Sequence, residues 1–156
     1  MNYTINAQIE IEISQERKVI YTISKKHRGR LPQKDKGKGA KPQISKWIIK
    51  PQQEVSLFES ALKYGYEDKE KHNAWNILLD TNSVICVVGY SYEREELKIA
   101  KFVDSDQKDW WHGYPAHYVK NIQDIPPMSI LLAWQKAGYI STATMKRIKG
   151  GQPCNL

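Results

Sequence analysis

The chain has few cysteines and no long run of apolar residues. Its 156 residues include two cysteines, Cys86 and Cys154, which lie far apart in the sequence. Two distant cysteines do not build a disulfide framework, so we expect both thiols to be reduced and the protein to be cytoplasmic. No window approaches the roughly 20 apolar residues of a membrane-spanning helix, and the N-terminus lacks the pattern of a secretory signal. We therefore expect neither a membrane protein nor one secreted by that route.

The chain also lacks the motifs that hold common cofactors and metals. It has no GxxxxGK[ST] loop, no GxGxxG turn after a strand and no GxSxG elbow, which argues against nucleotide hydrolysis and serine esterase chemistry. Residues 104–109 begin like a calcium loop but lack the glycine at the sixth position and the distal glutamate. His112 and His117 are five residues apart with no cysteine pair nearby, which does not indicate structural zinc. We expect no metal site and no cofactor.

The overall composition is that of a folded globular protein. Hydrophobic residues make up 40% of the chain and charged residues 26%, and both values are ordinary for a protein with a buried core. A length of 156 residues lies within the usual range for one domain. We therefore predict a single domain over residues 1–156.

The N-terminal segment predicts a β-hairpin. Every second residue from 3 to 13 is apolar and the residues between them are polar, which is the period of a strand with one face on a core. After a polar break at 15–18, residues 19–23 alternate again. The two runs should therefore pair as antiparallel strands.

The middle of the chain predicts one helix and several more strands. Apolar residues recur at helical spacing within residues 52–64, which predicts an amphipathic helix. The apolar run 84–90 predicts a buried central strand with residues 97–103 as its partner. A further strand is expected near Trp47, whereas residues 67–79 fit a helix and a strand equally well.

The C-terminal region predicts two helices that form an αα-hairpin over residues 127–149. Pro127 suits a first helical turn, and Ser141 suits the N-cap of the second helix. The small residue, turn and basic second helix are also those of a helix-turn-helix, which would place Lys146 and Arg147 against DNA. With the strands above, the expected fold is α+β: a mostly antiparallel twisted sheet, a covering helix and a C-terminal helical pair.

The positive charge is concentrated in one segment. The chain has a net charge of +7, and residues 25–46 contain nine basic residues against one acid. Few apolar residues occur between 25 and 43, where glycines and prolines are frequent, which predicts a flexible basic arm. Such an arm can neutralise phosphates and release counterions. Its candidate nucleic-acid-binding residues are Lys25, Lys26, Arg28, Arg30, Lys34, Lys36, Lys38 and Lys41.

A second candidate site lies in the aromatic and histidine-rich segment 110–118. Its aromatic rings suit stacking on bases, and its two imidazoles suit metal-free phosphodiester cleavage, which needs a base for the 2′-hydroxyl and an acid for the leaving oxygen. The alternative is a packed corner with a tight turn at residues 112–115. The candidates are Trp110, Trp111 and Tyr114 for stacking and His112 and His117 for catalysis.

Two functions follow from these segments. The first is a nucleic-acid-associating protein that binds RNA or DNA, and its sharper form is a metal-independent ribonuclease with His112 and His117 as catalytic residues. The second is a non-enzymatic protein-interaction module, such as a regulatory or inhibitor subunit, whose basic arm binds an acidic protein partner. Whether the protein is an enzyme is open at this point.

Overall fold

The fold is built around a six-stranded sheet in a computed structural model that describes residues 3–30 and 44–156. All neighbouring strands run antiparallel except β2 and β9, which are parallel. The predicted α+β fold with a mostly antiparallel sheet is confirmed. In spatial order the strands are β1 (Gln8–Ser14), β2 (Arg17–Thr22), β9 (Trp110–Ala116), β8 (Ile99–Val103), β5 (Asn73–Asn76) and β4 (Glu67–Asp68).

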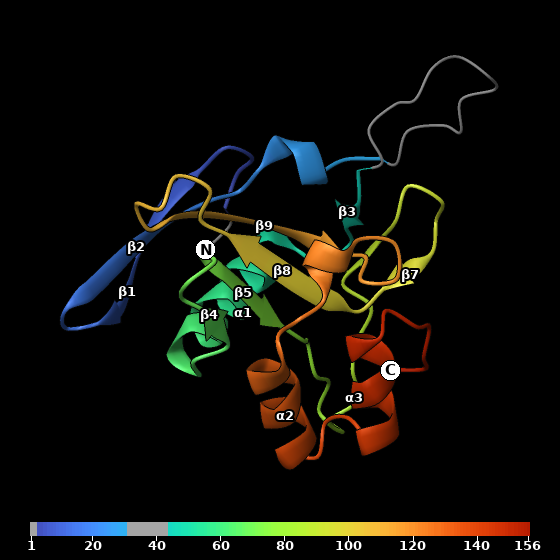
Figure 1. Ribbon diagram of the computed structural model, residues 1–156. Coiled ribbons are helices and arrows are strands. Elements are labelled where there is room, and N and C mark those ends of the chain that lie inside the picture. The colour runs from blue at the N-terminus through green and yellow to red at the C-terminus, as the bar shows by residue number, and fades with distance from the viewer. Residues whose placement is uncertain (1–2, 31–43) are drawn as a thin grey trace.

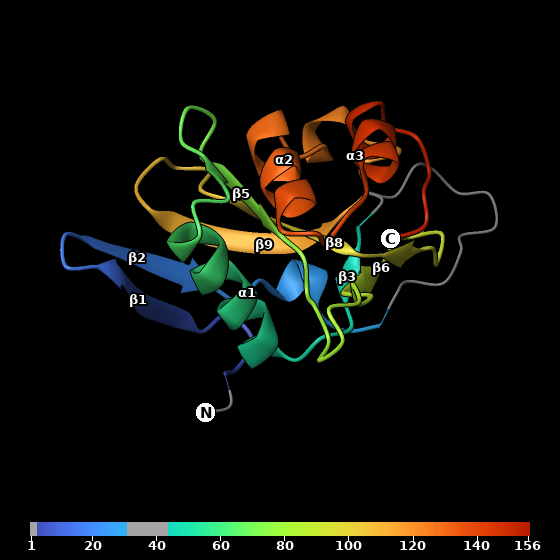
Figure 2. The ribbon, with the colours of Figure 1, turned by 90° about the horizontal axis from the view of Figure 1, so that it is seen from below.

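Helices lie on both faces of this sheet (Figure 1), as the view from below also shows (Figure 2). On one face α1 (Pro51–Lys63) packs its buried Phe58 against Trp111 of β9. On the opposite face α2 (Met128–Lys136) and α3 (Thr142–Lys149) enclose a second hydrophobic cluster with Ile99 of β8. The predicted covering helix and the predicted C-terminal helical pair are both present.

The local signals at the helix and hairpin ends act as the sequence indicates. Ile11 of β1 lies opposite Val19 of β2 in an antiparallel pair, as the two alternating runs predict. Pro51 occupies the first turn of α1, where its missing N–H costs no hydrogen bond. The Ser141 hydroxyl accepts a hydrogen bond of 3.0 Å from the Thr144 backbone N–H and so caps α3.

The predicted pairing of 84–90 with 97–103 holds only at one end, where Gly89 lies opposite Leu97. The prediction of a continuous central strand over 84–90 is wrong, because β8 pairs with β5 and β9 and not with this run. Only the end of the run is a strand, and it belongs to a separate small sheet. That sheet consists of β3 (Lys46–Trp47), β6 (Gly89–Tyr90) and β7 (Glu96–Leu97). The run is apolar because it passes between two cores: Ile85 packs in the cluster of α2 and α3, whereas Val88 packs in the cluster of α1.

Two other segments become strands. The ambiguous residues 67–79 contain β4 and β5, which pair with each other, and β5 also pairs with β8. The aromatic segment, which the sequence suggested as a corner or turn, is the central strand β9, with β2 on one side and β8 on the other. Short 3-10 helices, η1 (Lys25–His27) and η2 (Ile122–Asp124), lie near its C-terminal half. Within residues 3–30 and 44–156, no helix combines the length and the apolar character needed to cross a membrane.

Candidate functional site

An open cavity of about 420 Å³ gathers three of the four histidines of the chain. They come from three separate segments: η1, the strand β9 and the loop that follows β9. Lysines from η1 and from that loop also reach the cavity. The side chains on which the site is built are His27, His112, His117, Lys26, Lys120 and Tyr114.

His112 and Tyr114 reach the cavity because alternate residues of β9 face opposite sides of the sheet. Trp111, which directly precedes His112, points to the other side of the sheet, into the α1 core, and is 1% exposed. Burial lowers the pKa of His112, and the nearby Lys26 ammonium lowers it further, whereas Asp106 acts in the opposite direction. His112 is therefore a neutral imidazole at neutral pH, the form that accepts a proton.

His27 is a member of the cavity that the sequence did not identify. Its Nδ1 lies 2.9 Å from the Ser45 backbone carbonyl, which can only accept a hydrogen bond, so Nδ1 carries the proton and Nε2 is an acceptor. The ring stacks on Tyr114 with centroids 5.2 Å apart. Burial lowers the pKa of His27 to about 4, and Lys26, His112 and Lys46 contribute to the shift. The only sequence signal was its position between two basic residues, where it resembled a further cation of the arm.

His117 lies just beyond the end of β9 and is fixed through its backbone. Its N–H donates a hydrogen bond of 2.9 Å to Asp124 Oδ2, and its Nε2 lies 3.4 Å from Glu95 Oε1. The sequence suggested His112 and His117 as one site because two imidazoles occur together in the aromatic segment. The structure brings both side chains to the same cavity, although they come from a strand and a loop.

A buried carboxylate, Asp124, organises the floor of the cavity. It is 2% exposed, and its Oδ1 accepts a hydrogen bond of 2.6 Å from the Tyr114 hydroxyl. The Lys101 ammonium lies 3.4 Å from the same oxygen and donates a 2.6 Å hydrogen bond to the Gln123 carbonyl. Burial lowers the pKa of Lys101, and Asp124 opposes that shift. Asp124 therefore links Tyr114, on which His27 stacks, to the backbone of His117.

Two exposed cations stand at the rim of the cavity. Lys120 forms an ion pair with Glu93. Lys26 forms no ion pair with any side chain in the described part of the chain, so its ammonium is available to an anionic ligand. The Lys26 backbone carbonyl is held by the Lys46 ammonium at 2.6 Å, which fixes η1 against β3. The cavity thus combines the neutral imidazoles of His27 and His112 with the Lys26 ammonium, which has no ion-pair partner among the described residues.

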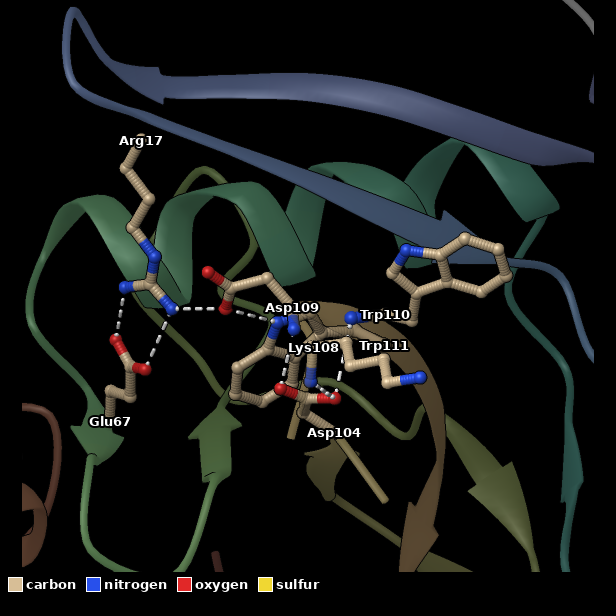
Figure 3. Close-up of polar contacts among 7 residues, drawn as sticks. All are labelled: Arg17, Glu67, Asp104, Lys108, Asp109, Trp110 and Trp111. Atoms are coloured by element: carbon tan, nitrogen blue, oxygen red, sulfur yellow. Dashed lines mark hydrogen bonds and ion pairs between the residues drawn. The ribbon is translucent and has the colours of Figure 1, made fainter. Parts of the chain in front are cut away.

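The loop that leads into β9 is fixed by the Asp104 carboxylate (Figure 3). Its Oδ2 accepts a hydrogen bond of 2.8 Å from the Asp109 N–H, and its Oδ1 accepts bonds from the N–H groups of Lys108 and Trp110 at 3.2 and 3.3 Å. Asp104, the first carboxylate of the segment that begins like a calcium loop, therefore binds backbone amides. The hydrogen bonds that Asp104 accepts therefore fix the position at which β9 begins.

Arg17 ties the start of β9 to the rest of the sheet (Figure 3). Its guanidinium forms two hydrogen bonds with Glu67 of β4, at 2.8 and 3.0 Å, and a third with Asp109 Oδ1 at 2.8 Å. The Trp111 indole N–H donates to the same Asp109 oxygen at 3.2 Å. Burial alone would raise the pKa of Asp109, but the hydrogen bonds from Arg17 and Trp111 outweigh it and lower that pKa. These contacts hold β9 in the register that directs His112 to the cavity.

The remaining aromatic and C-terminal candidates lie apart from the cavity. Trp110 stands at the first position of β9 and is 48% exposed, while Trp111 is enclosed by the α1 core and offers no face to a base. Lys146 and Arg147 are exposed on α3, where Arg147 donates a hydrogen bond of 3.2 Å to the Pro153 carbonyl.

The candidates of the basic arm have different surroundings. Arg28 is nearly buried and donates hydrogen bonds of 2.5 Å to Glu54 of α1 and to the Ile49 carbonyl, so its guanidinium already has internal partners. Lys25 and Arg30 are exposed near Lys26. Four arm candidates lie outside the described residues: Lys34, Lys36, Lys38 and Lys41.

Comparison with known proteins assigns no family to the chain. No protein-family model matches it, and neither a curated protein nor a solved structure does. Among residues 3–30 and 44–156, no three or more histidine, cysteine, aspartate or glutamate side chains group as metal ligands would.

Proposed function

We propose that the protein binds RNA at this cavity and cleaves its phosphodiester bonds without a metal ion. The observation that carries the proposal is the meeting of His112 and His117 in one open cavity that the Lys26 ammonium also lines. Two imidazoles supply the base and the acid that transesterification needs, and a cation stabilises the charge that develops on phosphorus oxygens. The basic arm, whose Lys26 lines the cavity, adds attraction for the phosphate backbone.

The reaction assigns one role to each group. His112 removes the proton from a ribose 2′-hydroxyl, and the 2′-oxygen then forms a bond to phosphorus. The bond from phosphorus to the 5′-oxygen breaks, and His117 donates a proton to that oxygen. The products are a 2′,3′-cyclic phosphate and a free 5′-hydroxyl, with the Lys26 ammonium stabilising the phosphorane between them.

The environments of His112 and His27 suit them to act on a substrate. A general base must be unprotonated when substrate binds, and burial and Lys26 keep His112 neutral by lowering its pKa. His27 presents Nε2 as an acceptor and suits a contact with a substrate hydroxyl or amino group. Because the 2′-hydroxyl is the nucleophile, the proposal requires RNA and excludes DNA as a substrate.

The test is incubation of the purified protein with a single-stranded RNA and a DNA of the same sequence, in chelator and at two salt concentrations. We expect salt-sensitive binding, chelator-resistant cleavage of RNA alone and a cyclic phosphate product. His112→Ala and His117→Ala should abolish cleavage while circular dichroism stays unchanged. His72→Asn is the matched control, because His72 is the one histidine that does not line the described cavity. Cleavage of DNA, or full activity in both alanine variants, would overturn the proposal.

A second candidate function is a protein-interaction module with an acidic partner. Ile122 favours it, since this residue of η2 is 83% exposed next to the cavity-lining Asn121 and Gln123. The Ile122 side chain would offer an apolar contact to a partner whose acidic groups meet Lys26 at the cavity. Failure to bind RNA at low salt, together with a stoichiometric protein complex that Ile122→Ser disrupts, would select this function.

A further inference from the structure

A second cavity of about 220 Å³ adjoins the first, and His117 lines both. The second cavity lies between β7, the start of β8, the chain just beyond β9 and the C-terminal residues 153–156. Its walls carry apolar groups of Leu97, Ala116 and Val119 and the ring of Tyr118. Thus His117 stands at the boundary between two open spaces of different size and character.

The two cavities differ in chemistry. The first holds His27, His112 and the lysine ammonium groups, which suit a ribose and a phosphate. The second combines apolar and aromatic side chains, from Leu97, Val119 and Tyr118, with the charged side chains of Glu95, Glu96 and Lys98. Its apolar and aromatic part suits the flat face of a nucleobase. At its margin the Lys98 ammonium donates a hydrogen bond of 2.8 Å to the Leu156 backbone oxygen, and Glu96 offers an acceptor.

We propose that RNA binds across His117, with the nucleoside that carries the reacting 2′-hydroxyl in the first cavity and the leaving nucleoside in the second. This inference rests on the proposed function and names its smallest complete substrate, a dinucleotide. The scissile phosphate then lies beside the one imidazole that both cavities share.

The positions of the imidazoles agree with the direction of the reaction. His112 lines the first cavity, where the 2′-hydroxyl loses its proton, and it is absent from the lining of the second among the described residues. His117 must protonate the 5′-oxygen of the leaving nucleoside, and its Nε2 lies 3.4 Å from Glu95, a residue of the second cavity. The acid is therefore on the side of the leaving group, and the base is on the side of the nucleophile.

The second cavity should be needed for transesterification of RNA but not for hydrolysis of the 2′,3′-cyclic phosphate. Transesterification of a dinucleotide uses both cavities. Hydrolysis of the 2′,3′-cyclic phosphate uses the first cavity only, because a water molecule replaces the leaving nucleoside. His117 then acts as the base that takes a proton from water, and His112 returns a proton to the 2′-oxygen as its bond to phosphorus breaks.

The experiment fills the second cavity and compares both steps. Val119 is 40% exposed at its wall, so Val119→Trp and the smaller change Val119→Phe add an aromatic ring there without replacing a core residue. We expect kcat/KM for a dinucleotide to fall by about tenfold or more, as expected when a pocket is blocked. Hydrolysis of a nucleoside 2′,3′-cyclic phosphate should change less than about twofold. Val84→Trp is the matched control, because Val84 is 54% exposed and lies in neither cavity lining.

The outcomes separate this inference from the proposed function. If the parent protein cleaves neither substrate, the proposed function fails and the two-cavity inference fails with it. If the parent protein is active but both Val119 variants lose the two activities equally, or lose neither, the inference alone is overturned. The Val119→Phe and parent proteins should have the same thermal unfolding temperature. A loss of transesterification in this variant is then not caused by a folding defect.

Discussion

Gly113 of β9 lies directly opposite Phe102 of β8, and the Phe102 ring fills the space that a side chain at position 113 would need. A Cβ atom on Gly113 would come within 2.7 Å of the Tyr21 hydroxyl and closer still to Phe102 Cδ1. Both neighbours are fully buried and cannot turn toward solvent. The glycine in the aromatic segment therefore serves close packing within a strand.

Replacing Gly113 with alanine should destabilise the protein strongly. Overpacking of a rigid core typically costs 1–3 kcal/mol, so we expect the free energy of unfolding to fall by about 3 kcal/mol. Urea denaturation followed by tryptophan fluorescence measures it. Gly138→Ala is the control, because a Cβ there meets nothing within 4 Å and only the left-handed backbone, with φ at +82°, resists it, at about 1 kcal/mol. Equal losses in the two variants would mean that the core at Gly113 relaxes.

The neighbouring tryptophans should differ sharply in their effect on stability. Trp111 is 1% exposed and packs on Phe58, so Trp111→Ala should lower the free energy of unfolding by about 4 kcal/mol. Trp110 is 48% exposed, and Trp110→Ala should cost less than about 1 kcal/mol. Thermal unfolding of both variants tests this. A larger loss for Trp110 than for Trp111 would contradict the orientation of β9.

Asp124 and Lys101 should show coupled contributions to stability. Asp124→Asn leaves the Lys101 ammonium, 3% exposed, without its anion, and we expect a loss of about 3 kcal/mol. Lys101→Met in the Asp124→Asn background should cost less than it does in the parent protein, because no buried cation then remains. A double-mutant cycle from urea unfolding should give a coupling energy of about 1 kcal/mol or more. Additive losses would show that the two side chains do not act as a pair.

Stability should fall as the solution is acidified through the range set by His27. The unfolded chain keeps the ordinary imidazole pKa of 6.5, whereas burial lowers the native pKa to about 4. Between these values the unfolded state binds more protons, so the free energy of unfolding decreases as the pH falls from 6.5 to 4, by about 3 kcal/mol. His27→Asn keeps a donor for the Ser45 carbonyl and removes the titration. Urea unfolding at pH 7, 5.5 and 4.5 should give a shallower dependence for this variant, and an unchanged slope would contradict the prediction.

Much of the fold follows from local patterns in the sequence. Alternation in residues 3–13 and 19–23, helical spacing in 52–64 and the Ser141 cap each specify their element, because the deciding interactions are within the element. The run at 84–90 misled because its apolar residues are shared between two cores. An apolar run indicates that its residues are buried, but Ile85 and Val88 are buried without forming a continuous strand.

The strand β9 and the burial of His27 depended on tertiary contacts. Gly113 and Pro115 are typical of turns, but here the glycine makes room for Phe102, and the proline lies where β9 has left β2, which pairs only with residues 110 and 111. His27 became a cavity residue because Ser45 and Tyr114, from distant segments, bind it. No local pattern could indicate these partners. His112 and His117 were found because their residue type alone suggests proton transfer.

The hydrogen bonds of the Lys46 ammonium affect which changes of chain length the protein can tolerate. It donates hydrogen bonds to the Lys26 and Arg28 carbonyls at 2.6 and 3.1 Å, so the stretches before residue 31 and after residue 43 are joined to each other. Lengthening a connection whose ends are already fixed is inexpensive, since a doubling costs only about 0.6 kcal/mol of closure entropy. Insertions and deletions between positions 31 and 43 should therefore be tolerated while the histidines keep their places.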